Sequence, residues 1–348
     1  MRKTDKKRTT VKDIAREAGV STALVSFVMS NEYGNGNYRV CPETTKRILE
    51  LAKELDYHPN TYARTLKSGR SNTIGVIFSD ISNPFFAEIA RLIEDEAFKR
   101  GYSVLFGSTD ESAEKMKRLV DALLSKGVDG MIVVPCSGSD GIVSSINGSG
   151  MPVVLLDRDV KDVSIPSVLL DNAQSSYALT ENLFEKGYSH IEMISYSMPL
   201  SNIIDREAGY LNCMSVHGVG DSARIHKSGY LFDKAWFDSV IADAKARGVG
   251  AFVFATNTLA TQGIFSMISS GFRIPEDFGI STFDKNESFD YFSTGITYAL
   301  QPLAQFTTES MRMLFKLIGR ETLPPEDIKV ILQPTIIDCS EHQNIKKQ

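Results

Sequence analysis

The chain has 348 residues, of which 42% are hydrophobic and 23% are charged, an ordinary composition for a globular protein of two or three domains. No run of 18 or more apolar residues occurs, and the charged N-terminus lacks the apolar stretch of a secretory signal, so we expect a cytoplasmic protein with no membrane contact. The four cysteines are scattered without the spacing of metal ligands, which argues for a reducing compartment and against a disulfide framework or a zinc site.

The net charge of -5 is unevenly distributed along the chain. Residues 1–72 carry 14 Lys and Arg against 8 Asp and Glu, a net charge of +6, whereas the remainder is acidic. A basic segment joined to an acidic body suggests that one end of the molecule faces a polyanion. Basic N-termini are also common solubility features, so the charge alone leaves both interpretations open.

A helix-turn-helix motif is predicted behind a basic, disordered arm at residues 1–9. Gly19 supplies the left-handed residue that ends the first helix, and Ser21 or Thr22 can cap the second. A third helix is expected over residues 42–55. The apolar side chains that should close a small core are Val11, Ile14, Ala15, Ala18, Leu24, Val25, Val28, Ile48, Leu49, Ala52 and Leu55. In such a motif the second helix enters the DNA major groove.

DNA contacts in this domain, residues 10–59, are expected from the exposed face of the second helix and from its flanks. Phe27 either packs on a thymine methyl group or lies in the core of the domain. The insert at residues 31–40, rich in Gly and Asn, either touches the DNA backbone or forms a solvated loop. The candidate DNA-binding residues are Thr10, Val11, Ser21, Thr22, Ala23, Ser26, Phe27 and Ser30.

A short helix is predicted between Pro59, which breaks the chain, and Gly69, with Asn60 as its cap. Isolated helices of fewer than about 12 residues are marginal in water. The segment at residues 60–72 should therefore become helical only when something holds it.

From Thr73 onwards, apolar runs of four to six residues alternate with amphipathic helices, a pattern typical of buried parallel sheets. Strands are expected at 73–78, 103–107, 130–135, 152–157, 167–171, 190–195, 251–256 and 279–284, with one closing strand near residues 330–337. Residues 123–135 and 243–255 share a helix-Gly-Val-Gly-strand pattern. Two similar α/β halves indicate a two-lobe, periplasmic-binding-protein-like (type I) fold with a ligand between the lobes.

The motifs TVKDIAREAGVS, PET, LDYHPN, ARTL and SGRSNTIGVI, in this order, resemble the lactose repressor (LacI/GalR) family of bacterial transcription regulators. The resemblance runs from residue 10 to about residue 333. It implies an all-α DNA-binding domain, a hinge helix and linker at 60–72, and an α/β effector and dimerisation domain at 73–340. Its lobe 1 would hold about 73–169 and 301–328, and its lobe 2 about 170–298 and 329–340.

The same resemblance assigns roles around the hinge. Leu66 matches the leucine that family members insert at a central base step, and Asn60, Ala63 and Arg64 match neighbouring minor-groove contacts. The chain departs from the family at Phe27, where most relatives carry an Arg. The bidentate guanine contact that such an Arg makes is therefore missing, which leaves open which bases are read.

Polar and aromatic residues follow several predicted strands, where ligands of open α/β sheets bind. The resemblance implies that Phe85 or Phe86 stacks on the effector, that Arg206 grips its oxygens, and that Asp284 accepts its hydroxyls. Tyr230 is an aromatic platform or a surface residue. The candidate effector-binding residues are Asp80, Asn83, Phe85, Phe86, Asp157, Arg206, Tyr230, Asn257 and Asp284, and Arg158, Asp171 and Asn172 also follow strands.

Thr256-Asn257 stands where the family usually has Asn-Asp or Asp-Asp, so one acidic ligand contact is missing and the ligand class stays open. A carbohydrate fits the carboxylates and amides, and a nucleobase remains an alternative because stacking aromatics serve both. The sequence contains no P-loop and no pair of histidines or cysteines at metal-ligand spacing, so we expect neither an enzyme nor a cofactor.

We therefore expect a homodimeric, ligand-responsive regulator, a repressor rather than an activator, of carbohydrate-utilisation genes. Its operator should be a palindrome that matches the two-fold symmetry of the dimer. The rival interpretation is a ligand-sensing protein with little sequence-specific DNA binding.

Overall fold

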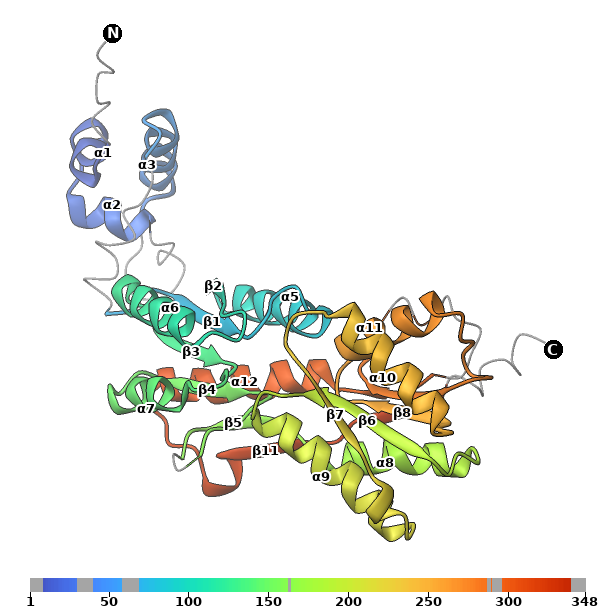
Figure 1. Cartoon of the computed structure of the whole chain (residues 1–348). Helices are drawn as coiled ribbons and strands as arrows, with labels where there is room; N and C mark the ends of the chain where they lie inside the picture. Colours follow the sequence, from blue (N-terminus) through green and yellow to red (C-terminus); the bar gives the residue numbers. More distant parts are fainter. Residues whose placement is uncertain are drawn as a thin grey trace, which may run out of the picture. The chain divides into compact units, whose positions relative to one another are not determined.

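The computed structural model of the protein describes residues 9–29, 40–57, 69–161, 164–286, 289 and 296–338. The chain divides into two units at Ser71 (Figure 1). The hinge residues Asn60, Ala63, Arg64 and Leu66, the base-contact candidate Ser30 and most of the insert at 31–40 lie outside the described residues. No helix within the described ranges has the length and apolar character that crossing a membrane requires.

The small unit contains three helices: α1 (Val11–Ala18), α2 (Thr22–Met29) and α3 (Pro42–Glu54). The Asp13 carboxylate accepts hydrogen bonds from the backbone N–H and the hydroxyl of Thr10, at 2.9 and 2.7 Å, and so fixes the start of α1. Gly19 ends α1 at φ +66°, as expected. The Ser21 hydroxyl accepts from the Leu24 N–H at 3.2 Å, so Ser21 caps α2.

The core of the small unit forms as predicted except at one position. Ile14, Val25 and Ile48 are fully or almost fully buried where the three helices meet. Leu49, expected in the same core, is 42% exposed, and this expectation was wrong. A helix turns by about 100° per residue, so Leu49 cannot share the inward direction of Ile48.

The large unit is built on two six-stranded sheets among the described residues. In lobe 1 the strand order is β11-β5-β4-β3-β1-β2 and all pairs are parallel; in lobe 2 it is β12-β10-β9-β8-β6-β7, and only β12 runs antiparallel to its neighbour. Lobe 1 contains β1 (Thr73–Phe78), β2 (Ser103–Ser108), β3 (Gly130–Val133), β4 (Val153–Leu156), β5 (Ser167–Leu170) and β11 (Lys329–Leu332). Lobe 2 contains β6 (Ile191–Tyr196), β7 (Ile225–Ser228), β8 (Ala251–Phe254), β9 (Gly279–Phe283), β10 (Thr297–Leu300) and β12 (Thr335–Asp338).

Helices cover these sheets (Figure 1). Those of lobe 1 are α5 (Pro84–Lys99), α6 (Ala113–Lys126), α7 (Asp140–Gly148) and α12 (Leu303–Ile318). Those of lobe 2 are α8 (Asn172–Glu185), α9 (Ser201–Val216), α10 (Lys234–Ala246) and α11 (Asn257–Ser269). The eight expected strands are present, whereas α7, β7 and β10 were not predicted, and only the end of α10, from residue 243, was expected.

The closing segment differs from the expectation in one respect. It forms two short strands, and β11 pairs with β5 in lobe 1, so residues 329–332 belong to lobe 1 and not to lobe 2. The second strand, β12, pairs with β10 in lobe 2. Pro334 lies between them, has no N–H to donate to a ladder, and so ends the first strand. The chain therefore passes between the lobes after β5, after β10 and between β11 and β12.

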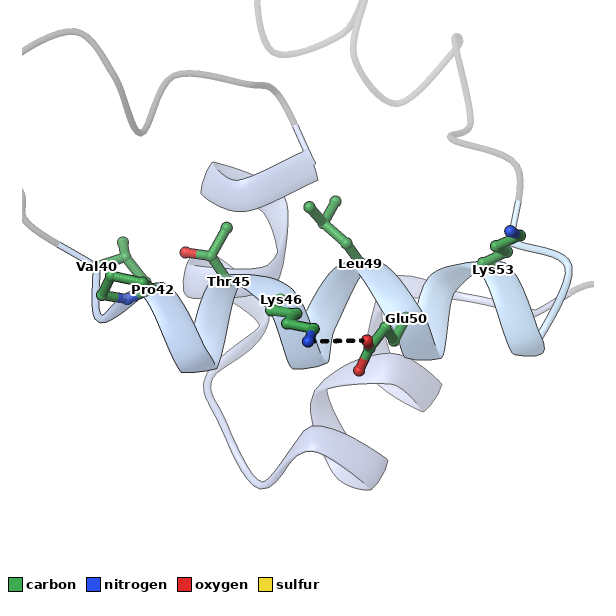
Figure 2. A pocket seen from close by; sticks show the side chains of 7 residues that line it. All are labelled: Val40, Pro42, Thr45, Lys46, Leu49, Glu50 and Lys53. Atoms are coloured by element: carbon green, nitrogen blue, oxygen red, sulfur yellow. Dashed lines mark ion pairs between the residues drawn. The ribbon is translucent and has the colours of Figure 1, made fainter.

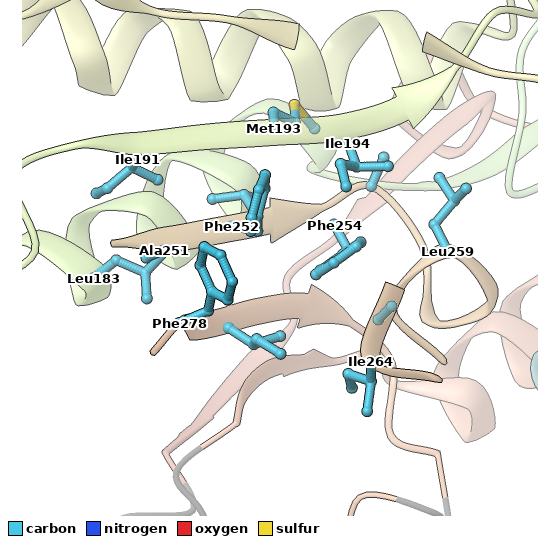
Figure 3. Packing of buried hydrophobic residues seen from close by; sticks show 14 of the residues in the cluster. Leu183, Ile191, Met193, Ile194, Ala251, Phe252, Phe254, Leu259, Ile264 and Phe278 are labelled. Carbon is cyan, nitrogen blue, oxygen red and sulfur yellow. The ribbon is translucent and has the colours of Figure 1, made fainter. Parts of the chain in front are cut away.

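Lobe 2 encloses a core rich in aromatic side chains, shown in Figure 3. Phe252 is the centre of this cluster, with ring centroids 6.0 Å from Phe254 and 5.4 Å from Phe278. The Ile191 and Ile194 side chains of the adjacent strand are fully buried in the same cluster. A continuous run of apolar side chains on a central strand is what burial on both faces requires.

The close packing of α8 against α9 depends on a glycine in α9, Gly209. A Cβ atom at Gly209 would lie 2.0 Å from the Ala173 carbonyl oxygen, so only Gly allows this approach.

We expect Gly209→Ala to lower the free energy of unfolding by about 1–3 kcal/mol, because the backbone and not a flexible side chain must move. Urea unfolding checks this, with Gly141→Ala as the control. Gly141 lies in α7 with no atom within 4 Å of an added Cβ, and a Gly141→Ala loss as large as that of Gly209→Ala would contradict the account.

Candidate nucleic-acid interface and effector site

The structure places most of the predicted base-contact residues on one exposed face. Ser21, Thr22, Ala23 and Ser26 are all exposed at the start and along the outer side of α2. Phe27 is half-buried and is not among the described side chains that pack against the core of the small unit. The exposed side chains are small, and their hydroxyl groups are suited to a close approach of the helix to base edges.

Helix α1 contributes apolar side chains to the core and two exposed cations to the surface of the small unit. Thr10 is exposed and its hydroxyl is engaged by Asp13, whereas Val11 is half-buried and packs against the core. Lys12 and Arg16 are exposed on α1. Cations beside a recognition helix are suited to phosphate contacts, which position a protein on the duplex without reading sequence.

A surface hollow of about 540 Å³ lies along α3 (Figure 2). Its lining includes the exposed Leu49 and the aliphatic stems of Lys46 and Glu50, whose charged ends are 3.9 Å apart. None of the predicted DNA-binding residues that the structure describes lines this hollow.

In the large unit, the predicted effector residues gather where the two lobes meet. Asp157 follows β4 of lobe 1, and its carboxylate accepts from the Asn202 amide of α9 in lobe 2 at 3.1 Å. The Tyr230 hydroxyl of lobe 2 donates to Asp80 of lobe 1 at 3.0 Å. Side chains of the two lobes thus touch one another beside the ends of β1, β4 and β7.

Arg206 is the central cation of this cluster and is almost fully buried. It donates to the Asn172 side-chain oxygen and to the Ala255 carbonyl, both at 2.7 Å. Its guanidinium carbon lies 3.7 Å from the centre of the Phe283 ring. These bonds use two of the five N–H donors of an arginine, and they hold the guanidinium plane in a fixed direction.

Two carboxylates flank this arginine at equivalent places in the two lobes. Asp157 follows β4 at φ +64° and Asp284 follows β9 at φ +61°, a left-handed conformation that costs free energy for a non-glycine residue. Burial raises the pKa of Asp157, against the opposing effect of Arg158 and Arg206. Burial likewise raises the pKa of Asp284 to about 7, although Arg206 and the Gln301 amide, which donates at 3.0 Å, oppose it.

This raised pKa predicts a pH dependence of stability. Between pH 3.8, the ordinary pKa of an Asp side chain, and about 7, folded Asp284 keeps a proton that the unfolded chain releases, so stability should fall as pH rises through this window. In Asp284→Asn this part of the slope should vanish. Thermal unfolding from pH 5 to 8 checks the prediction, and identical slopes for both proteins would refute it.

Several buried polar atoms of the cluster have no hydrogen-bond partner among the described residues. They are Asp157 Oδ1, Asn257 Nδ2 and Gln301 Oε1, and the three side chains are 4%, 2% and 4% exposed. Buried polar atoms without partners are rare in folded proteins and are costly. Two acceptors and one donor match a ligand that both donates and accepts, as a hydroxyl-rich molecule does.

Three other candidates have structural contacts of their own. The Asn83 side chain accepts from the Phe85 N–H at 3.1 Å and caps α5. Phe85 and Phe86 are 6% and 3% exposed and pack in the lobe 1 core, with ring centroids 4.9 Å apart. Little of either ring is therefore open to a ligand.

Sequence reasoning missed three residues of the cluster. Asn202 and Gln301 come from the start of α9 and from a crossing segment, not from the end of a strand. Glu111 forms a buried ion pair with Arg158 at 2.8 Å. The left-handed φ of +58° at Glu111 is a local signal, but it becomes visible only in the structure.

Comparisons with known proteins agree with this architecture. Residues 10–60 match the family described as bacterial regulatory proteins, lacI family. Residues 71–228 match periplasmic binding proteins and sugar binding domain of LacI family, and residues 180–338 match a periplasmic binding protein-like domain.

The chain is 34% identical to the HTH-type transcriptional regulator RegA of Clostridium saccharobutylicum over 95% of this chain and 98% of that protein. It is 33% identical to Catabolite control protein A of Staphylococcus epidermidis, over 93% of this chain and 96% of the relative. The Lac repressor bound to ONPG shares the fold, with a TM-score of 0.80 and 22% identity over 96% of this chain and 99% of that one. The sequence relatives are transcription regulators and not enzymes, and the chain belongs to the LacI family of bacterial DNA-binding transcription regulators.

Proposed function

We propose that this regulator is a homodimeric repressor of carbohydrate-utilisation genes, bound to a palindromic operator and switched by a carbohydrate held between its lobes. The observation that carries the effector assignment is the group of unpartnered buried polar atoms on Asp157, Asn257 and Gln301 beside the Arg206 guanidinium. Such a regulator acts on the chromosome and therefore works in the cytoplasm.

Residues 10–59 act as the DNA-binding domain in this proposal, with α2 in the major groove. The exposed hydroxyls of Ser21, Thr22 and Ser26 would meet base edges, while Ala23 offers a methyl contact. Lys12 and Arg16 would contact phosphates. The segment at 60–72 would form the hinge helix and its linker, with Leu66 as the wedge that unstacks a central base step.

The polar cluster between the lobes favours a carbohydrate over a nucleobase. A sugar presents hydroxyl groups that can donate to Asp157 and Gln301 and accept from Asn257, the three side chains with unpartnered atoms. A nucleobase would need an open aromatic face, yet Phe85 and Phe86 are almost fully buried. Solved proteins of this fold include a CelR–cellobiose complex and a regulator complexed with D-xylulofuranose, both under 25% identical to this chain.

The switch would act through the contacts that join the lobes. Asp80–Tyr230 and Asp157–Asn202 are hydrogen bonds between lobe 1 and lobe 2, and a ligand bound beside them changes how the lobes close. A ligand moves this balance only by binding one closure state more tightly than the other. Lobe closure would in turn set the spacing of the two hinge segments of a dimer.

Exposed apolar side chains support the homodimer. In lobe 2, Leu231 is 79% exposed, and Phe232 and Phe265 lie edge to face with ring centroids 6.1 Å apart at the surface. In lobe 1, Phe98 is 81% exposed. An exposed aromatic cluster is typical of an interface, and a second copy with two-fold symmetry would cover the same patch on both chains.

Calorimetric titration of a ligand panel tests the effector class. We expect one class of sugar or sugar derivative to bind to the wild-type protein, and nucleobases and nucleosides to give no heat. The variant Asn257→Leu removes one partner of the ligand and should weaken that binding on the order of tenfold or more. Binding of a nucleobase with no response to any sugar would replace this proposal with the nucleobase-responsive alternative.

A further inference from the structure

Helices α8 and α9 run side by side in lobe 2 and bring together three side chains that the effector cluster does not use (Figure 1). Glu181 lies on α8, and Cys213 and His217 lie four residues apart at the end of α9. One carboxylate oxygen, the thiol sulfur and one imidazole nitrogen all lie within 4.8 Å of one another. All three are atom types that bind transition metals.

The geometry of this trio is defined by the two helices. The Glu181 carboxylate lies 2.7 Å from His217 Nε2 and 3.4 Å from Cys213 Sγ. Residues four apart on a helix share one face, which is why the sulfur and the imidazole point the same way. Gly209, one turn before Cys213, allows α8 to approach closely enough for Glu181 to reach them.

The histidine ring is held in place and the trio is open on one side. The His217 ring stacks on Phe184 with centroids 3.8 Å apart and planes 5° from parallel. Cys213 is fully buried, whereas the side chains of His217 and Glu181 are 30% and 33% exposed. The sulfur therefore lies at the base of the trio, and a metal ion has a path from solvent.

We propose that Glu181, Cys213 and His217 form a zinc-binding site, with the thiolate, the imidazole nitrogen and a carboxylate oxygen as three ligands and water as the fourth. Tetrahedral zinc with bonds of about 2.0–2.3 Å places its ligand atoms roughly 3.3–3.8 Å apart. The sulfur–carboxylate distance already lies in this range. The Glu181–His217 distance needs to widen by about half an ångström, which a carboxylate at the end of a flexible side chain can do.

The thiol must lose its proton when the metal binds. Burial, together with the hydrogen bond to Glu181, raises the pKa of Cys213 to about 12, so without a metal the thiol donates to that carboxylate. A coordinating thiol is deprotonated by the metal itself. Zinc would thus replace the contacts that Glu181 of α8 makes with Cys213 and His217 by three metal–ligand bonds that join the same two helices, and the thiol proton would pass to solvent.

The site is linked through the helices to the effector cluster. The same two helices carry Asn172 and Arg206, which are hydrogen-bonded near their N-terminal ends. Cys213 lies seven residues beyond Arg206, about 10 Å along the helix axis. Zinc would therefore clamp the pair of helices that holds the central arginine, and it should raise the thermal stability of the large unit.

Cobalt(II), which occupies zinc sites and absorbs light, tests the proposal on the tag-free, metal-stripped full chain under reducing conditions. We expect one cobalt per chain, a thiolate-to-cobalt charge-transfer band in the near ultraviolet, and loss of that band on adding zinc. Cys213→Ser should lose the band, and His217→Gln should weaken binding on the order of tenfold or more. Cys41→Ser, which removes an exposed cysteine of the small unit, should keep the band unchanged.

Two results would overturn the site. One is a wild-type protein with native circular dichroism that takes up no cobalt or zinc at millimolar concentration. The other is a charge-transfer band that survives in Cys213→Ser or is lost in Cys41→Ser. Should Cys213→Ser fail to fold, the wild-type titration and the exposed substitution His217→Gln still decide the question, and binding that His217→Gln leaves unchanged counts against the site.

Discussion

Replacing Arg206 by Ala is expected to abolish the effector response and to lower the free energy of unfolding by about 3–5 kcal/mol. The substitution leaves the buried Asp157 carboxylate and the half-buried Asp284 carboxylate without the cation that interacts with both. It also leaves the Ala255 carbonyl and the Asn172 side-chain oxygen without a hydrogen-bond donor, because each accepts a 2.7 Å bond from this arginine. Removing one partner of a buried charge cluster lowers the free energy of unfolding by more than the intact cluster contributes to it.

Urea unfolding and ligand calorimetry measure the two parts of this prediction separately. Arg206→Lys keeps the positive charge but loses the planar guanidinium with its fixed set of N–H donors. It should therefore recover part of the stability and little of the ligand binding. Arg273→Ala is the matched control, because Arg273 has a side chain that is 73% exposed and a 3.8 Å pair with Asp277. A full effector response in Arg206→Ala would remove this residue from the proposed site.

Replacing Glu192 by Leu should cost about 3–5 kcal/mol of stability, although Glu192 belongs to neither proposed binding site. Glu192 is fully buried on β6. It accepts from Arg247 Nη2 at 2.9 Å and lies 2.7 Å from His226 Nε2. Its removal leaves the Arg247 guanidinium and the His226 imidazole without their common hydrogen-bond partner.

The same group predicts how the protein responds to acid. Burial opposes the ionisation of Glu192, but the hydrogen bonds from Arg247 and His226 outweigh it and lower the pKa from 4.5 to about 2. The stabilisation is therefore complete above about pH 4.5 and is lost as pH falls towards 2. Acid unfolding of Glu192→Gln should begin from a lower stability and show a weaker dependence on pH in this range.

An exposed ion pair provides the control for the stability loss expected in Glu192→Leu. Glu114 pairs with Arg118 on α6, and both side chains are more than three-quarters exposed. Surface pairs of this kind contribute about 0–1 kcal/mol, so Glu114→Gln should change stability little. Equal losses in Glu114→Gln and Glu192→Leu would show that the buried network has no special role.

The regular elements were predictable where the hydrophobic pattern is strong. Central strands such as β4 and β8 are buried on both faces, and their apolar runs are visible in the sequence. The edge strand β7 has the sequence IHKS and lacks such a run, so it was missed. Leu49 shows the opposite error, because an apolar side chain next to a core position is not itself a core position.

The effector cluster was predictable only in part. Asp157 and Asp284 follow buried strands, so a general rule for α/β sheets locates them. Asn202 and Gln301 enter the cluster through the meeting of two lobes, and no local pattern marks them. The Glu181, Cys213 and His217 trio was overlooked because Glu181 is 32 residues from Cys213 in the chain, and only the packing of α8 against α9 joins them.

The central claim is that this chain reads a specific palindromic operator. The measurement that tests it most directly is to mix the purified protein with sheared genomic DNA at physiological salt and to sequence the fragments that remain bound. The account predicts enrichment of a two-fold symmetric motif with an easily kinked central step, beside genes for sugar use. Diffuse enrichment without a shared motif, lost on a modest increase in salt, would contradict it and would favour a ligand sensor with little sequence-specific DNA binding.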